Sequence, residues 1–156
     1  MMAAGRAAAC GARVLLLEKN ATLGKKLLIT GGGRSNVTNA EFDRHILLAK
    51  FKENAKFLFS PFAQFGVEEA LDFFHTRGMP TKVEAEKRVF PVSDSAQSVW
   101  DVLVAYMAQA GVTVRSEAPV TGFVMREQRI VGVALVGGEV IEGSRYILAT
   151  GGKSRP

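Results

Sequence analysis

The residues best suited to chemistry in this chain form one run, Thr30-Gly31-Gly32-Gly33-Arg34-Ser35-Asn36. Glycine costs about 0.5–1 kcal/mol relative to alanine inside a helix or strand, so three in succession predict backbone that bends sharply or approaches a ligand closely. The arginine, hydroxyl and amide groups that follow are donors suited to phosphate or hydroxyl oxygens. A simple turn is the alternative for any glycine-rich run, and the flanking sequence decides between the two.

A second candidate ligand, Glu18, ends the apolar run Val14 to Leu17. The alanine-rich segment before it predicts a helix of small side chains, closed by Gly11 in a left-handed conformation. The apolar run predicts a short strand buried on both faces, as parallel strands are. A small-residue helix leading into a strand that ends in an acid is typical of the second half of a dinucleotide-binding βαβ unit, where the acid binds the ribose hydroxyls.

The first half of such a unit, a strand with a Gly-x-Gly-x-x-Gly turn, does not precede the helix in this sequence. We therefore expect the sequence to be a fragment that lacks them. A targeting peptide is the alternative, since residues 1–17 contain Arg6 and Arg13 and no acid. The apolar run is too short for a signal-peptide core and Glu18 follows it at once, which favours the βαβ interpretation.

Residues 24–39, from Gly-Lys-Lys-Leu-Leu-Ile to Arg-Ser-Asn-Val-Thr-Asn, closely resemble the signature of the aminoacetone-oxidase-like (BaiN-like) family of FAD-binding flavoproteins. Further matches follow in the family's order at residues 88–93, 96–99 and 147–152. The resemblance extends over nearly the whole chain, but only over the N-terminal part of a family protein. It implies an FAD-dependent oxidoreductase that acts on a small-molecule substrate, with FAD as cofactor and NAD(P)H as a further expected reductant.

The resemblance also implies an α/β fold class: a Rossmann-like FAD-binding fold of the glutathione-reductase type, with a parallel sheet, helices and a three-stranded β-meander, incomplete at both ends. One partial FAD-binding domain would cover residues 1–156, with a helical and hairpin insertion at about 42–92 and the meander at about 119–142. The family usually carries cysteine where this chain has Ser35, so thiol chemistry is not expected there. No general acid or base is assigned, and no metal ligand. The expected cofactor contacts are Glu18, Lys19, Lys25, Thr30, Gly31, Gly32, Gly33, Arg34, Ser35, Asn36, Val120, Thr150, Gly151 and Gly152.

The remaining elements follow from apolar spacing and turn residues. Helices are predicted wherever apolar residues recur every three or four positions, and the phenylalanines between residues 57 and 74 are expected in the core. Strands are predicted wherever apolar residues alternate or run together between turn residues. The predicted helices are 42–56, 67–77 and 96–110, the last capped within Ser93 to Ser95; the predicted strands are 81–86 and 88–92 as a hairpin, then 112–115, 120–126, 129–136, 139–142 and 146–149.

Composition limits the function classes. With 47% hydrophobic and 22% charged residues, the chain has the make-up of one soluble globular domain. Its one cysteine, Cys10, rules out a disulfide framework and predicts a cytoplasmic setting, and no apolar stretch approaches the ~20 residues that span a bilayer, so we expect no membrane partner.

A net charge of +5 raises the question of nucleic acid. The basic residues are scattered, and their one cluster, Lys19, Lys25, Lys26 and Arg34, flanks the glycines, where a dinucleotide pyrophosphate would fit as well. We therefore expect no nucleic-acid partner, and the oligomeric state is left open. Two alternatives to a flavoprotein remain at this point: a nicotinamide-dinucleotide domain, and a non-enzymatic nucleic-acid-binding module that uses the basic loop.

Overall fold

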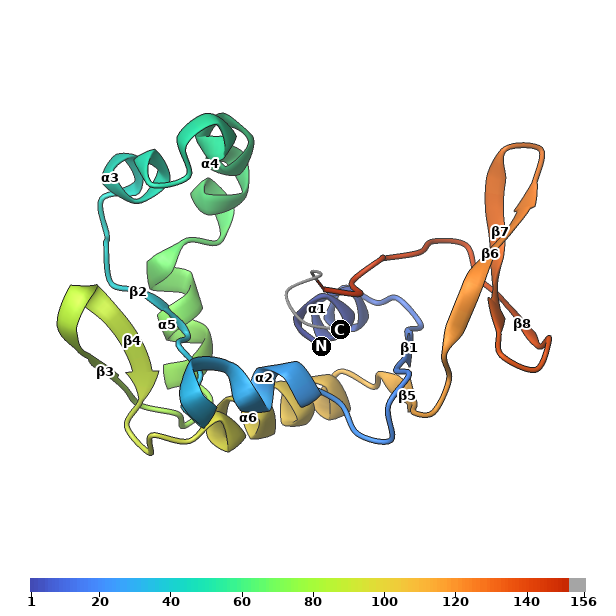
Figure 1. Ribbon diagram of the computed structural model, residues 1–156, viewed down its shortest axis with the longest axis horizontal. Helices are drawn as coiled ribbons and strands as arrows, with labels where there is room; N and C mark the ends of the chain where they lie inside the picture. Colours follow the sequence, from blue (N-terminus) through green and yellow to red (C-terminus); the bar gives the residue numbers. More distant parts are fainter. Residues whose placement is uncertain (152–156) are drawn as a thin grey trace. The chain divides into compact units, whose positions relative to one another are not determined.

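The computed structural model describes residues 1–151, which divide into two compact units. The first unit comprises residues 1–23 together with the chain from residue 107 onward, and the second comprises residues 24–106. The boundary falls inside helix α6 (Ala96–Gln109), which was predicted over almost the same residues. Each unit contains its own sheet structure (Figure 1).

The first unit contains a short parallel strand pair. Strand β1 (Leu15–Leu17) pairs with β5 (Thr113–Arg115), so that Leu15 lies opposite Thr113. The predicted strand is therefore present, but its expected burial on both faces is wrong, because Leu15 is 41% exposed. Within residues 1–151 this sheet has only two strands, which leaves the outer edge and part of the faces of β1 uncovered.

Helix α1 (Met2–Ala9) precedes β1 and ends as the sequence predicts. Gly11 has a φ of +90°, and its N–H donates to the carbonyl of Ala8 at 2.8 Å. A left-handed residue at this position satisfies helix carbonyls that would otherwise lack a donor, and glycine adopts that conformation without a steric cost. Cys10, the residue between the helix and this glycine, is exposed.

The predicted three-stranded meander is present in the first unit (Figure 1). Its antiparallel strands are β6 (Val120–Arg126), β7 (Arg129–Leu135) and β8 (Val140–Glu142), in that order across the sheet. Glu127 and Gln128 form the first turn with φ values of 47° and 64°, and two glycines form the second. Two-residue turns of positive φ match the twist of antiparallel strands. The apolar residues on either side of these turns located the strands in the sequence.

The segment that follows β8 contains no strand within the described residues, so the strand predicted over Tyr146 to Ala149 is wrong. Ile147 and Leu148 are 66% and 71% exposed there. An apolar run forms a strand only beside another strand that supplies hydrogen-bond partners, and no strand within residues 1–151 pairs with this one.

The second unit contains a three-stranded antiparallel sheet. Strand β4 (Arg88–Pro91) lies between β2 (Thr38–Asn39) and β3 (Thr81–Val83). The predicted hairpin of β3 and β4 is confirmed, whereas β2 was not predicted, because a two-residue strand has no alternating pattern to detect. Val89 and Phe90 at the centre of β4 are 0% and 4% exposed, so this strand forms the core of the unit.

The helices of the second unit differ in extent from the prediction. The helix expected over 42–56 is instead α3 (Arg44–Ala49), a 3-10 turn, and the start of α4 (Ala55–Gln64). The break falls at Lys52, whose φ of 51° cannot continue a right-handed helix. Helix α5 (Val67–His75) lies within the predicted range 67–77. Within residues 1–151, no helix combines the length and the apolar character needed to cross a membrane.

The expected burial of the phenylalanines holds only in part. Phe74 on α5 is 7% exposed, but Phe57, Phe59 and Phe65 are 80%, 43% and 47% exposed. None of the residues of α4 is buried, because among the described residues α3 and the segment after it cover only part of this helix, as in the ring contact between His45 and Phe59. Spacing therefore identified the apolar side of the helix, but could not show whether another element packs on it.

Candidate functional site

The glycine run forms a left-handed turn in the second unit, directly after the short helix α2 (Lys25–Ile29). Gly31 and Gly32 have φ/ψ values of 60°/33° and 68°/31°, and Gly33 has a φ of 85°. Residues with a Cβ pay roughly 1–2 kcal/mol in this region, so the three glycines make a sharp bend possible. The bend predicted from the sequence is confirmed.

One face of this turn is crowded and another is open. A Cβ on Gly31 would lie 3.2 Å from the backbone nitrogen of Asn36 and 3.5 Å from Cε1 of Phe90. A Cβ on Gly32 would meet no atom within 4 Å. Within the described residues the turn therefore packs against β4 through Gly31, and leaves the backbone at Gly32 accessible to a ligand.

The two residues after Arg34 hold the turn in shape. Ser35 is 3% exposed with a φ of 58°, and its N–H donates to the carbonyl of Thr30 at 2.9 Å. The side-chain amide of Asn36 donates to the carbonyls of Thr38 and Val89 at 2.8 and 3.1 Å. Both residues were expected at the cofactor; the structure shows that each bonds to the protein's own backbone around the turn.

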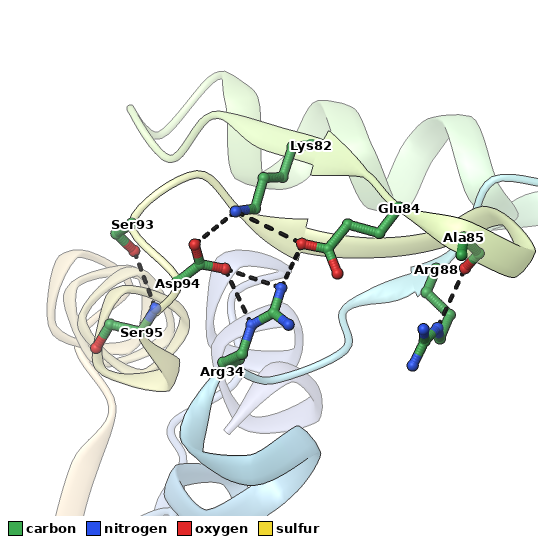
Figure 2. Close-up of polar contacts among 8 residues, drawn as sticks. All are labelled: Arg34, Lys82, Glu84, Ala85, Arg88, Ser93, Asp94 and Ser95. Carbon is green, nitrogen blue, oxygen red and sulfur yellow. Dashed lines mark hydrogen bonds and ion pairs between the residues drawn. The ribbon is translucent and has the colours of Figure 1, made fainter.

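Arg34 lies in a cluster of four charged side chains (Figure 2). Its Nη2 lies 2.5 Å from Oε1 of Glu84, its Nε donates to Oδ1 of Asp94 at 3.0 Å, and its Cζ lies 4.0 Å from the centre of the Phe90 ring. Lys82 completes this four-charge cluster, with its Nζ 2.5 Å from Oδ2 of Asp94. The hydrogen bond from Arg34 lowers the pKa of Glu84, and that from Lys82 lowers the pKa of Asp94.

Two further expected contacts flank the turn. Lys25 is exposed at the first position of α2, and Thr30 donates through Oγ1 to the carbonyl of Lys26 at 2.8 Å. The structure thus brings Lys25 and residues 30–36 together in the second unit as one local site.

In the first unit, Glu18 follows β1 at the carboxyl end of the parallel pair. Its N–H donates to Arg115, and its carbonyl accepts from Ala118, at 3.0 and 2.9 Å. Oε1 accepts from both the backbone N–H and the side-chain Nδ2 of Asn20, at 2.9 and 2.6 Å. Both bonds are made to Oε1, so they orient the carboxylate and leave Oε2 able to accept a hydrogen bond. The carboxylate lies at the carboxyl end of the strands, where nucleotides bind in open α/β sheets.

The other residues predicted for the first unit lie near chain turns and strand ends. Lys19 is exposed beside Glu18, and Val120 begins β6 with 46% of its surface exposed. Thr150 and Gly151 are exposed, with a φ of +78° at Gly151, and Gly152 lies outside the described residues.

Sequence reasoning missed the residues that position the others. Asn20, two residues after Glu18, carried a signal that could have been used, because asparagine often bonds to groups two positions away in turns. No sequence signal identified Glu84 or Lys82 as part of the site, and Asp94 was predicted only as a helix cap. Among the residues that the structure describes, no three His, Cys, Asp or Glu side chains are grouped to hold a metal ion.

Comparison with known proteins supplies the family. The HI0933-like protein Rossmann domain matches residues 1–156. A 3-dehydro-bile acid delta(4,6)-reductase of Clostridium scindens is 35% identical over 150 residues, which are 92% of this chain and 34% of that protein. A ribosomal RNA dihydrouridine synthase of Escherichia coli K12 is 30% identical over 157 residues, which are 100% of this chain and 38% of that protein.

The chain thus spans little more than a third of the length of these two relatives, at 34% and 38%. A solved structure, glycine oxidase from Bacillus cereus ATCC 14579, is 13% identical with a TM-score of 0.47, covering 89% of this chain and 48% of that one. The match of the Rossmann domain over the whole sequence agrees with a fold of helices, a parallel strand pair and an antiparallel three-stranded sheet. This chain therefore belongs to the HI0933-like family, the FAD-binding Rossmann family that its glycine-arginine motif resembles.

Proposed function

We propose that the protein is an FAD-dependent oxidoreductase in which this chain holds FAD. The observation that carries the proposal is the carboxylate of Glu18, oriented by Asn20 at the carboxyl end of the parallel strand pair. A carboxylate at this place accepts hydrogen bonds from the ribose hydroxyls of a dinucleotide. The flavin, when bound, transfers hydride or electrons between a donor and an acceptor.

The described residues fit such a cofactor in each unit. In the first, the meander β6 to β8 follows the parallel pair in the order expected for this type of FAD fold, and Val120, which begins it, is 46% exposed. In the second, the left-handed turn offers an open approach at Gly32. We assign the ribose to Glu18, the adenosine side to Val120 and Thr150 to Gly152, and the pyrophosphate and ribityl region to backbone of residues 30–36, with Lys19 and Lys25 as nearby cations.

The names of the two relatives suggest the class of substrate that we propose for this protein. One is named a reductase of a bile acid, and the other a synthase of dihydrouridine in ribosomal RNA. We propose that this protein reduces a small organic substrate, with NAD(P)H supplying the electrons, in the cytoplasm. An RNA substrate is an outcome that binding assays at increasing salt would reveal, because phosphate contacts weaken steeply as salt rises.

The test uses the full-length protein. Purified protein should carry a flavin absorbance band and release FAD on denaturation. Glu18→Ala should weaken FAD binding by about 1–3 kcal/mol, because hydrogen bonds to a charged acceptor are lost. Glu142→Ala, which removes an exposed carboxylate at the end of β8 in the same unit, is the matched control and should leave the affinity unchanged.

Three results would count against the proposal. Protein without flavin that binds NAD would favour a nicotinamide-dinucleotide domain instead. Protein without flavin that binds RNA in a strongly salt-dependent way would favour a nucleic-acid-binding module. Unchanged FAD affinity in Glu18→Ala would remove Glu18 from the site.

A further inference from the structure

We propose that Arg34 is a positioning residue, which fixes the glycine turn on strands β3 and β4 and does not bind the pyrophosphate of the cofactor. The proposal rests on the FAD function proposed above. It replaces the simplest expectation from the sequence, in which an arginine after a glycine run reaches out to phosphate.

The guanidinium of Arg34 is already engaged by partners in its own unit. Its Nη2 and Nε bond to Glu84 and Asp94, and one face of its plane lies over the Phe90 ring. Figure 2 shows the side chain pointing toward these two carboxylates, whereas Arg88 on β4 points away toward Ala85. These contacts use Nε, Nη2 and one face of the guanidinium. A phosphate could then reach only Nη1 without displacing them, and the charge that Nη1 would offer is already neutralised by the two carboxylates.

The charges of the cluster balance. Arg34 and Lys82 supply two positive charges, and Glu84 and Asp94 supply two negative ones. The cluster therefore has no surplus positive charge for an anionic ligand. If Arg34 turned to a phosphate, Lys82 alone would remain to neutralise both carboxylates, which are about one third and one half exposed.

The same contacts connect the cluster to the glycine turn. The Phe90 ring lies under the guanidinium and also faces Gly31, where a Cβ would lie 3.5 Å from Cε1. Asp94 adopts a φ of 54°, which is uncommon for a residue with a side chain, and in that conformation its two oxygens reach Arg34 and Lys82 separately. The turn is thereby joined to β3 through Glu84 and to the start of α6 through Asp94.

The two roles of Arg34 predict opposite effects when its partner is removed. If Arg34 positions the turn, Glu84→Ala and Arg34→Met both weaken FAD binding, by about fivefold or more, and the double variant is no weaker than Arg34→Met alone, because both changes break one interaction. If Arg34 binds phosphate, Glu84→Ala frees the guanidinium and leaves FAD binding unchanged or tighter. Affinity is measured by quenching of flavin fluorescence in the full-length protein.

Two further measurements separate these roles. Salt screens a direct charge contact to the phosphates of FAD. Loss of such a contact would lower the slope of log Kd against log salt concentration in Arg34→Met, whereas loss of a positioning residue changes that slope little. A displaced turn should also alter the visible circular dichroism of the bound flavin. Arg88→Met is the control, because Arg88 lies 5.9 Å from the centre of the same ring but outside the cluster, and it should behave as the wild type.

If Glu84→Ala fails to fold, Glu84→Gln replaces it, because glutamine keeps the shape of the side chain and removes its charge. Glu84→Gln is also expected to weaken FAD binding. Unchanged or tighter FAD binding in either Glu84 variant, or a lowered salt slope in Arg34→Met, overturns the proposal. Wild-type protein that carries no FAD would instead overturn the proposed function, so the two failures are distinguishable.

Discussion

Replacing two neighbouring glycines by alanine measures how tightly the turn folds against Asn36, the residue that connects it to strands β2 and β4. Gly31 and Gly32 share the left-handed conformation, with φ values of 60° and 68°. Alanine therefore meets the same backbone cost at both positions, about 1–2 kcal/mol. The two sites differ only in what the new Cβ would touch, so the pair contains its own control.

The difference between the two variants can be worked from the structure. At Gly32 the Cβ enters open space, so Gly32→Ala should lower the free energy of unfolding by the backbone cost alone. At Gly31 the Cβ would lie 3.2 Å from the backbone nitrogen of Asn36, which cannot move without disturbing the bonds of that residue to β2 and β4. Crowding of this kind adds about 1–3 kcal/mol, so Gly31→Ala should be the less stable variant by that amount.

The assay is urea unfolding of the FAD-loaded full-length protein, with the midpoint and slope compared for both variants. A change in midpoint at constant slope reports stability rather than a change in compactness. Equal destabilisation of Gly31→Ala and Gly32→Ala would refute the close approach of Gly31 to the backbone of Asn36. A larger effect at Gly32 would show that the open face of the turn is covered.

Two further predictions concern a core side chain and an acid. Met107 on α6 is 1% exposed, so Met107→Ala should lower the free energy of unfolding by about 2–5 kcal/mol through loss of burial and an added cavity, as measured by urea unfolding. The hydrogen bond from Lys87 lowers the pKa of Glu41, so the ionised acid stabilises the fold above its ordinary pKa near 4.5, and this contribution is lost as the pH falls below that value. Glu41→Gln should therefore reduce the loss of stability at acidic pH in a plot of the free energy of unfolding against pH. An unchanged loss would contradict the ion pair.

Elements defined by local chemistry were predictable from the sequence. Gly11 marked the end of α1, and Gly111, the residue directly after the predicted helix 96–110, marked the end of α6; both are left-handed. The meander was located by its apolar strands and the turns between them, and the bend at Gly31 to Gly33 by the glycines alone. In each case the cause lies within a few residues of its effect, so a single sequence contains the information.

Features that depend on distant partners were not predictable. Arg34 bonds to side chains 50 and 60 residues away, and nothing in its own neighbourhood identifies them. The exposed Phe57 on α4 and the unpaired run at Ile147 carry apolar patterns typical of buried elements. A pattern shows which face could be buried, but burial itself needs a partner surface, which no local pattern specifies.

The turn between β6 and β7 has a consequence for protein engineering. Glu127 and Gln128 both hold positive φ values without being glycine or asparagine, the residues that adopt this conformation most easily. They lie far along the sequence from the four-charge cluster and contact none of its members in the described interactions. An Asn-Gly pair at these positions would relieve backbone strain in a solvent-facing hairpin and so raise the stability of the fold. In this more stable protein, destabilising substitutions around Arg34 could be tested while the protein stays folded.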